Sequence, residues 1–145
     1  MARFLLSFAV LIAGTAFWST EAAAQAKFPK AVLRPELWEK VSVATSQECE
    51  GTAKECSLRF LEGAGLAIET KPAISEYRLG EVEGRSLTIV FVAYKVSNDD
   101  SVTGIRYRLA VSLGDVEDRS YILENLGRQY TCARGHRNWS RALCP

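Results

Sequence analysis

The chain has 145 residues, 48% of them hydrophobic and 24% charged, and its 18 lysines and arginines against 17 acidic residues leave a net charge of +1. A chain of this length forms one domain with a modest core, and its near-neutral charge argues against a general nucleic-acid binder. Four cysteines and one histidine restrict the metal sites and redox motifs that it can build.

The first 24 residues have the three-part order of a secretory signal peptide. Arg3 and the α-amino group supply positive charge, residues 4–18 carry no charge, and small residues follow at cleavage spacing. The uncharged run is shorter than the roughly 20 apolar residues of a membrane-spanning helix. We therefore expect cleavage after Ala24, with Ala26 as the alternative, and a mature single domain over residues 25–145.

The mature segment lacks the features of a membrane-attached protein. No cysteine follows either cleavage position, so a lipoprotein anchor is not expected, and no later stretch approaches 18 consecutive apolar residues. The removed piece holds one Arg and one Glu, so the mature net charge stays at 17 minus 16, or +1. We expect a soluble periplasmic or secreted product without stable membrane insertion.

All four cysteines, Cys49, Cys56, Cys132 and Cys144, lie in the mature segment. An even number of cysteines in an exported domain favours disulfides, although three pairings are possible. We favour Cys49 with Cys56 and Cys132 with Cys144, because short rings can close within locally folded segments. The spacings do not fit a zinc knuckle and no Cys-x-x-Cys is present, so neither a metal nor a thioredoxin-like site is expected.

The first part of the mature chain predicts two helices with a strand between them. Residues 35–40 begin with proline, carry acids early and end in lysine, which predicts a short helix. Residues 41–46 place β-branched side chains at alternate positions and predict a strand. Residues 52–62 have apolar side chains at helical spacing before Gly63, which predicts a helix, with a strand as the alternative.

The middle of the chain predicts strands. Residues 66–70 and 74–82 are expected to be strands on either side of a turn. Residues 87–96 are apolar on both faces, as in a central strand covered on both sides. The polar residues 97–101 predict a turn, and the alternation over residues 105–113 predicts an antiparallel partner strand that is half exposed.

The remaining segment predicts a short helix over residues 120–126, ended by Gly127, and a last strand over residues 129–133. Together these elements predict an α+β fold: a single small domain with a mainly antiparallel sheet of four to six strands, short helices on one side and disulfide bonds.

Recognisable catalytic arrangements are absent from the sequence, so no catalytic residue and no cofactor is assigned. His136 is the only histidine, and we favour an exposed loop position for it over a catalytic role. A pair of carboxylates that face each other across a cleft remains an alternative. Its candidates are Asp99, Asp100, Asp115, Glu117 and Asp118.

The C-terminal segment, residues 128–145, combines four arginines and two aromatic residues with no acidic residue. Planar cations beside aromatic rings suit an anionic partner, such as an anionic glycan, a phosphate group or an acidic protein. The alternative is a disulfide-closed tail whose tryptophan packs into the core while its arginines are solvated. Asn138 formally begins an N-glycosylation motif, which we treat as incidental. The candidate binding residues are Arg134, His136, Arg137, Trp139 and Arg141, with Arg128 and Tyr130 beside them.

Three stretches resemble the VirK family of small exported bacterial proteins. Residues 41–49 resemble its early strand ending in cysteine, residues 91–96 with 98–102 its tyrosine-containing strand and turn, and residues 130–132 its closing cysteine segment. The resemblance implies a periplasmic or secreted accessory protein of a bacterial virulence system that works on plant hosts, and it assigns no catalytic residue.

The leading hypothesis for the function of the chain is a non-enzymatic exported accessory or binding protein. The alternatives are a small hydrolase with paired carboxylates and a protein inhibitor of a hydrolase.

Overall fold

The structure is a computed structural model that describes residues 29–43, 48–97, 99–114 and 120–145. The predicted signal peptide and both of its candidate cleavage positions lie outside these residues.

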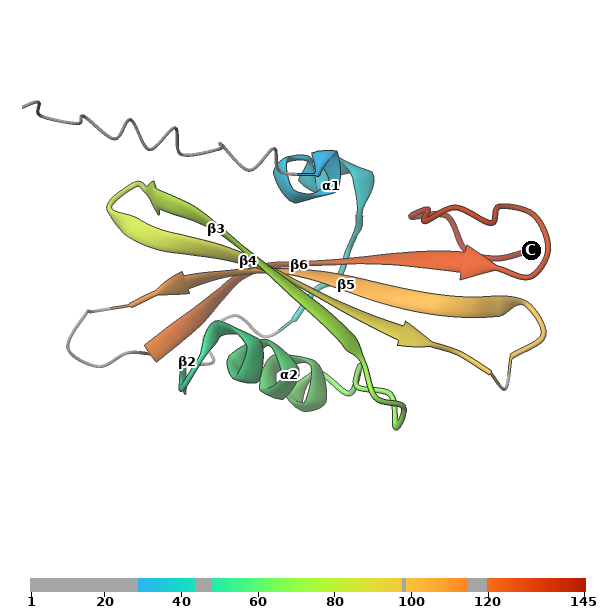
Figure 1. The fold of residues 1–145 in the computed structure, drawn as a ribbon, viewed down its shortest axis with the longest axis horizontal. Helices are drawn as coiled ribbons and strands as arrows, with labels where there is room; N and C mark the ends of the chain where they lie inside the picture. Colours follow the sequence, from blue (N-terminus) through green and yellow to red (C-terminus); the bar gives the residue numbers. More distant parts are fainter. Residues whose placement is uncertain (1–28, 44–47, 98, 115–119) are drawn as a thin grey trace, which may run out of the picture.

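The described residues form a curved sheet with short helices against it (Figure 1). The sheet runs in the order β1-β6-β5-β4-β3, β2 also pairs with β6, and every pairing is antiparallel. The predicted α+β fold with an antiparallel sheet is confirmed. The elements in chain order are α1 (Lys30–Leu33), η1 (Pro35–Leu37), β1 (Glu39–Lys40), β2 (Glu48–Glu50), α2 (Ala53–Gly63), β3 (Ala73–Val82), β4 (Arg85–Lys95), β5 (Val102–Leu113) and β6 (Ser120–Cys132).

The helices lie on both faces of the sheet and not on one side as expected. Figure 1 shows α2 on one face and α1 on the other. On the α2 face, Val90 and Leu109 pack in the main core, whereas on the α1 face Ile89 and Ala110 pack against Val32. Because neighbouring residues of β4 and β5 are apolar on opposite faces, each face needs a cover.

The helix predicted over residues 52–62 is confirmed as α2. Thr52 caps its start: the Thr52 hydroxyl accepts from the Glu55 amide at 3.2 Å, and the Glu55 carboxylate accepts from the Thr52 amide at 2.9 Å. The helix buries Cys56, Phe60 and Leu61 against the sheet. Burial of a large apolar side chain contributes about 1.5–3 kcal/mol, so this contact is a main source of stability.

The favoured disulfide pairing is also confirmed, and all four cysteines are bonded. Cys49–Cys56 joins β2 to α2, and Cys132–Cys144 joins the end of β6 to the C-terminal segment. By the loop-entropy model, rings of this size stabilise the folded state by about 2.5–3 kcal/mol each.

The central hairpin is formed as predicted, but its second strand is more buried than expected. β4 contains most of the predicted strand 87–96 and is covered on both faces. The predicted turn is closed by Asp99, whose Oδ1 accepts from the backbone amides of Ser101 at 2.7 Å and Val102 at 2.8 Å. In β5, Arg108 is only 6% exposed, because α1 lies over it.

Four sequence predictions fail because long-range contacts decide the local structure. The helix predicted before Gly127 is the first half of β6, one strand over Ser120–Cys132. The helix predicted over residues 35–40 ends at Leu37, since Glu39–Lys40 pairs with β6 as β1. The described part of the strand predicted over residues 41–46, and the strand predicted over residues 66–70, are not formed.

Candidate anion-binding site

Two glycines on the α1 face allow two indole rings to lie directly on the sheet. A Cβ at Gly127 in β6 would lie 2.7 Å from the Cβ of Trp38. A Cβ at Gly104 in β5 would lie 3.2 Å from Cη2 of Trp139 and 2.8 Å from Oγ1 of Thr131. Glycine inside a strand often marks such a close approach, and here each glycine provides the space for one tryptophan.

The side chain of Arg106, on β5, lies between these two indoles. Its Cζ is 4.9 Å from the ring centroid of Trp38 and 4.6 Å from that of Trp139. Both distances are within the range of cation–π attraction. The row continues from Trp38 to Phe91, whose ring is stacked on it at 5.4 Å, and from Phe91 to Tyr77 in an edge contact at 5.6 Å.

Gln129 fixes the orientation of the Arg106 guanidinium. The two residues face each other across β5 and β6, and Nε and Nη2 of Arg106 donate to Oε1 of Gln129 at 2.9 and 2.6 Å. Nε2 of Gln129 donates in turn to the carbonyl of Leu37 at 2.7 Å. Because a guanidinium has only donors, this network requires the amide oxygen to face it.

The positive charge of Arg106 has no counter-charge in the described part of the chain. No carboxylate of residues 29–43, 48–97, 99–114 or 120–145 forms an ion pair with Arg106 or Arg108. Arg108 donates from Nε and Nη2 to the carbonyl of Val32 at 3.3 and 2.9 Å. Burial lowers the pKa of Arg106 to about 10 and also lowers the pKa of Arg108. Arg106 therefore stays protonated at neutral pH, as an incompletely solvated cation.

A pocket of about 630 Å³ opens beside this cation. Arg141 lies on its rim and donates from Nη1 to the carbonyl of Glu36 at 3.1 Å. The Glu36 carboxylate is 2.8 Å from Nε of Arg34, and this hydrogen bond lowers the pKa of Glu36. The acid at the rim is thus already paired, and the pocket retains two arginines that are free of acid partners among the described residues. The lining residues are Ala31, Glu36, Leu37, Arg106, Gln129, Trp139, Ser140 and Arg141.

The residues predicted from the sequence divide into two groups. Trp139 and Arg141 line the pocket, and Trp139 is 36% exposed and lies on Arg106 instead of in a core cluster. Arg134 and Arg137 are exposed on the loop after β6, where Nη2 of Arg134 lies 3.7 Å from Oδ2 of Asp100. His136 is half-buried on the same loop, against the Cys132–Cys144 disulfide.

Arg128 and Tyr130 form a separate, neutralised cluster. Nε and Nη2 of Arg128 each donate to a carboxylate oxygen of Glu39 at 3.1 Å, and the guanidinium lies 5.1 Å from the Tyr130 ring. The hydrogen bond lowers the pKa of Glu39 and raises that of Arg128, while burial raises the pKa of Tyr130 to about 12. This arginine is balanced by an acid and is not available to a partner.

Sequence reasoning missed the residues at the centre of the site, Arg106, Gln129 and Trp38. The available signal was Gly104-Ile105-Arg106-Tyr107-Arg108, because alternation on a strand places Gly104, Arg106 and Arg108 on one face. The segments that cover that face could not be found from local pattern, since they come from both ends of the described chain.

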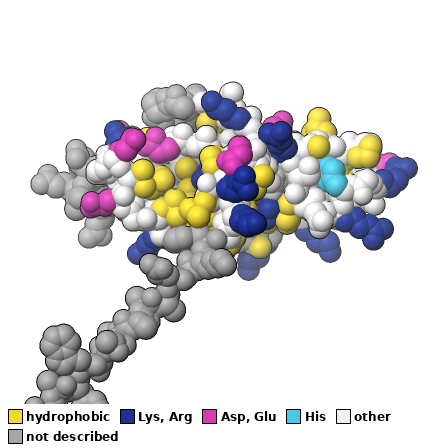
Figure 2. All heavy atoms as spheres, turned by 90° about the horizontal axis from the view of Figure 1, so that it is seen from above, with side chains coloured by type: hydrophobic (Ala, Val, Ile, Leu, Met, Phe, Trp, Pro, Cys, Tyr) yellow, Lys and Arg dark blue, Asp and Glu magenta, His cyan; other side chains and the backbone are white. Residues whose placement is uncertain are grey.

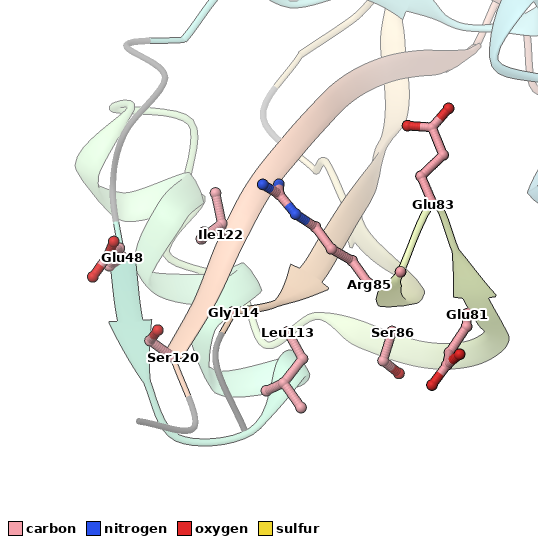
Figure 3. A pocket seen from close by; sticks show the side chains of 10 residues that line it. Glu48, Glu81, Glu83, Arg85, Ser86, Leu113, Gly114, Ser120 and Ile122 are labelled. Carbon is pink, nitrogen blue, oxygen red and sulfur yellow. The ribbon is translucent and has the colours of Figure 1, made fainter. Parts of the chain in front are cut away.

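The opposite end of the sheet has a different character. Figure 2, which shows the molecule from the α1 side, has acidic side chains toward one end and basic side chains toward the other, where His136 lies. Figure 3 shows the pocket of about 490 Å³ at the acidic end, lined by Glu48, Glu81, Glu83 and Arg85. Nη1 of Arg85 is 3.0 Å from Oε1 of Glu124.

The predicted candidates for a carboxylate pair do not meet in a described cleft. Asp99 accepts hydrogen bonds in its turn and Asp100 faces Arg134, whereas Asp115, Glu117 and Asp118 lie outside the described residues.

Within the described ranges, no group of His, Cys, Asp and Glu side chains could hold a metal ion. In the same ranges, no helix is long and apolar enough to cross a membrane.

Comparisons of the chain with protein-family models, with curated proteins and with solved structures gave no match.

Proposed function

We propose that the chain is an exported, non-enzymatic accessory protein that binds an anionic partner in the pocket beside Arg106. The observation that carries this proposal is the position of the Arg106 guanidinium: it is half-buried between two indoles without an acid partner among the described residues. A buried charge without a counter-charge lowers stability, so its presence favours a role in binding.

The arrangement fits a carboxylate group. Nε and Nη2 of Arg106 donate to Gln129, but Nη1 has no acceptor among the described residues. Arg141 lines the same pocket. Guanidinium groups bind carboxylates strongly, because the charges and the planar geometries match. The indole of Trp139, which lines the pocket, shields one side of the guanidinium from water, and this strengthens the attraction.

The shape of the site favours a carboxylate-bearing sugar over an acidic protein. A concavity of about 630 Å³ has the size of a small-ligand site, for which about 300–1,000 Å³ is typical. An acidic protein surface would meet the exposed Arg134 and Arg137 more readily than the recessed Arg106.

The cellular setting follows from the disulfides and from the sequence. Two disulfides indicate folding in an oxidising compartment. Together with the predicted signal peptide and the resemblance to the VirK family, they support a periplasmic or secreted accessory protein of a bacterial virulence system. Fusion of residues 1–24 to a phosphatase that folds only after export should give active enzyme. An inactive fusion would contradict this location.

Calorimetric titration of residues 25–145 with trigalacturonate tests the binding function. Arg106→Met should weaken binding at least about tenfold, since a hydrogen bond to a charged group contributes roughly 1.5–3 kcal/mol. Arg78→Met is the matched control: it removes the same charge from an arginine with an 84% exposed side chain, and it should change the affinity less than about twofold.

Three outcomes would contradict this proposal. Equal losses of affinity in Arg106→Met and Arg78→Met would show that binding depends only on the net charge of the protein. Binding of poly-glutamate but not of trigalacturonate, again dependent on Arg106, would identify an acidic protein as the partner class. Release of new reducing ends during the titration would instead support the hydrolase alternative.

A further inference from the structure

The disulfide Cys132–Cys144 encloses the segment that completes the pocket. Residues 133–143 lie between the two cysteines and include Trp139 and Arg141. The other attachments of the segment include hydrogen bonds: Tyr130 and Ser140 exchange two backbone hydrogen bonds of 2.8 and 3.0 Å, the Ala133 amide donates to the carbonyl of Ser101 at 2.8 Å, and Arg141 donates to the carbonyl of Glu36 at 3.1 Å. Its covalent closure therefore helps to keep Trp139 on Arg106.

The imidazole of His136 lies against one sulfur of this disulfide. Both ring nitrogens are 3.4 Å from Sγ of Cys132, and Nε2 is 3.1 Å from the carbonyl of Ala142. When the ring is protonated, Nε2–H donates to that carbonyl and Nδ1–H faces the sulfur. An imidazolium in this position stabilises a cysteine thiolate, as at reactive cysteines generally.

The two disulfides of the chain differ in access and in local charge. Cys49, Cys56 and Cys132 are at most 7% exposed, whereas Cys144 is half-buried, so an external thiol reaches the second bridge at Cys144. Residues 133–143 also carry three arginines and no acid. Nearby cations favour the thiolate that leaves when a disulfide opens.

We propose that Cys132–Cys144 is a redox-active disulfide that regulates the pocket. The thiolate of an external dithiol attacks Sγ of Cys144, the S–S bond breaks, and Cys132 leaves as a thiolate beside His136. The second thiol of the reductant then attacks the reductant sulfur that is bonded to Sγ of Cys144, and Cys144 leaves as a thiolate. Two electrons and two protons pass from the dithiol, which becomes a disulfide, to the two cysteines.

Opening of the ring removes the covalent attachment of the segment that carries Trp139 and Arg141 and leaves it held by noncovalent contacts alone. Only the effect on ligand affinity rests on the proposed function, because the reactivity of the disulfide is measured without any ligand. The mature segment offers a direct optical signal, since Trp38 and Trp139 are the only tryptophans in residues 25–145 and both contact Arg106.

The experiment treats folded residues 25–145 with dithiothreitol at neutral pH, stops the reaction by acid and alkylation, and locates the free cysteines by peptide mass spectrometry. Cys132–Cys144 should open at least about tenfold faster than Cys49–Cys56, because access and thiolate stability control exchange. Tryptophan emission should change with the same rate constant. Similar opening rates, or opening only in urea, would overturn the proposal.

Substitution of the histidine tests its part in the exchange. His136→Asn should slow the opening of Cys132–Cys144 at least about threefold and leave Cys49–Cys56 unchanged. Leu143→Ala, at a 69% exposed side chain in the same ring, is the matched control and should leave both rates as they are. An unchanged rate in His136→Asn, with a circular dichroism spectrum like that of the parent, would contradict the assignment.

Affinity for trigalacturonate separates this inference from the proposed function. The oxidised protein should bind at least about fivefold more tightly than the protein with Cys132 and Cys144 reduced and alkylated. Equal affinities would overturn the regulation of the pocket. If the oxidised protein binds no anion, the proposed function fails, and the alkylation rates and tryptophan emission still decide whether the disulfide is redox-active.

Discussion

The two faces of the sheet are held by different kinds of contact. On the α2 face, side chains such as Leu61, Val90 and Leu109 form an apolar core with almost no exposure. On the α1 face, the half-buried Arg106 is bonded to the buried Gln129 and lies between two indoles that come from opposite ends of the described chain. The first face gains stability from apolar burial and from the Cys49–Cys56 disulfide, whereas the second includes a charge whose desolvation costs stability. We infer from this comparison that the α2 face maintains the fold and that the α1 face carries the proposed binding site.

The largest expected effect is on the α2 face. Leu109→Ala removes a fully buried side chain and should lower the free energy of unfolding by about 3 kcal/mol, as measured by urea denaturation. Affinity for trigalacturonate should stay within about twofold, since Leu109 points away from the pocket. A loss below about 1 kcal/mol would show that this face is not the main source of stability.

The next effect tests whether glycine is required under the tryptophans. Gly127→Ala introduces a Cβ that would lie 2.7 Å from the Cβ of Trp38, and it should lower the free energy of unfolding by about 2 kcal/mol through overpacking. Gly104→Ala meets mainly the flexible edge of Trp139 and the Thr131 hydroxyl, so it should cost less stability but shift the tryptophan emission. Stabilisation by both substitutions would contradict the close packing of the indoles.

A smaller effect separates the charge of Arg106 from its packing. Arg106→Met leaves Oε1 of the buried Gln129 without its donor and should lower the free energy of unfolding by about 1 kcal/mol. Combination with Gln129→Leu removes the unpaired acceptor but leaves the carbonyl of Leu37 without its donor, so the double variant should recover only part of that loss. A double variant that is less stable than either single variant would show that Arg106 is needed for folding.

The smallest effect concerns Glu39 and Arg128, the balanced pair outside the pocket. The hydrogen bond from Arg128 lowers the pKa of Glu39 in the folded protein, so the pair stabilises the fold above the unfolded-state pKa and loses this effect as the pH falls through the folded-state pKa. Both side chains are about a third exposed, so Glu39→Gln should cost only about 0.5 kcal/mol at pH 7. Urea denaturation in acid should show no difference between the two proteins. A difference that persists there would contradict the ion-pair explanation.

The parts of the fold that depend on local signals could be predicted from the sequence, and the parts that depend on distant contacts could not. Helix α2 has a capping box and apolar spacing, and β4 is apolar on both faces, so both were predicted. The first half of β6 resembles a helix ended by Gly127, but that glycine provides space for Trp38, 89 residues away. The pattern before it therefore pointed to the wrong element.

The candidate site shows the same division. The C-terminal arginines and Trp139 were visible in the sequence as a cluster, and two of its members, Trp139 and Arg141, line the pocket. The sequence pattern predicts a half-exposed strand face around Arg106. The residues that cover Arg106 are distant in sequence: Trp38, which follows η1, and Trp139 in the C-terminal loop. Only the tertiary structure joins these segments around one cation.

The most direct test of the central claim is a nuclear magnetic resonance titration of isotopically labelled residues 25–145 with trigalacturonate, in which the arginine Nε–H and tryptophan indole N–H signals are followed. The account predicts that the signals of Arg106, Arg141 and Trp139 shift together and saturate at one dissociation constant, while the signal of Arg78 on β3 stays in place. Shifts of similar size at all exposed arginines, without saturation at Arg106, would contradict the assignment of the α1 face as the binding face.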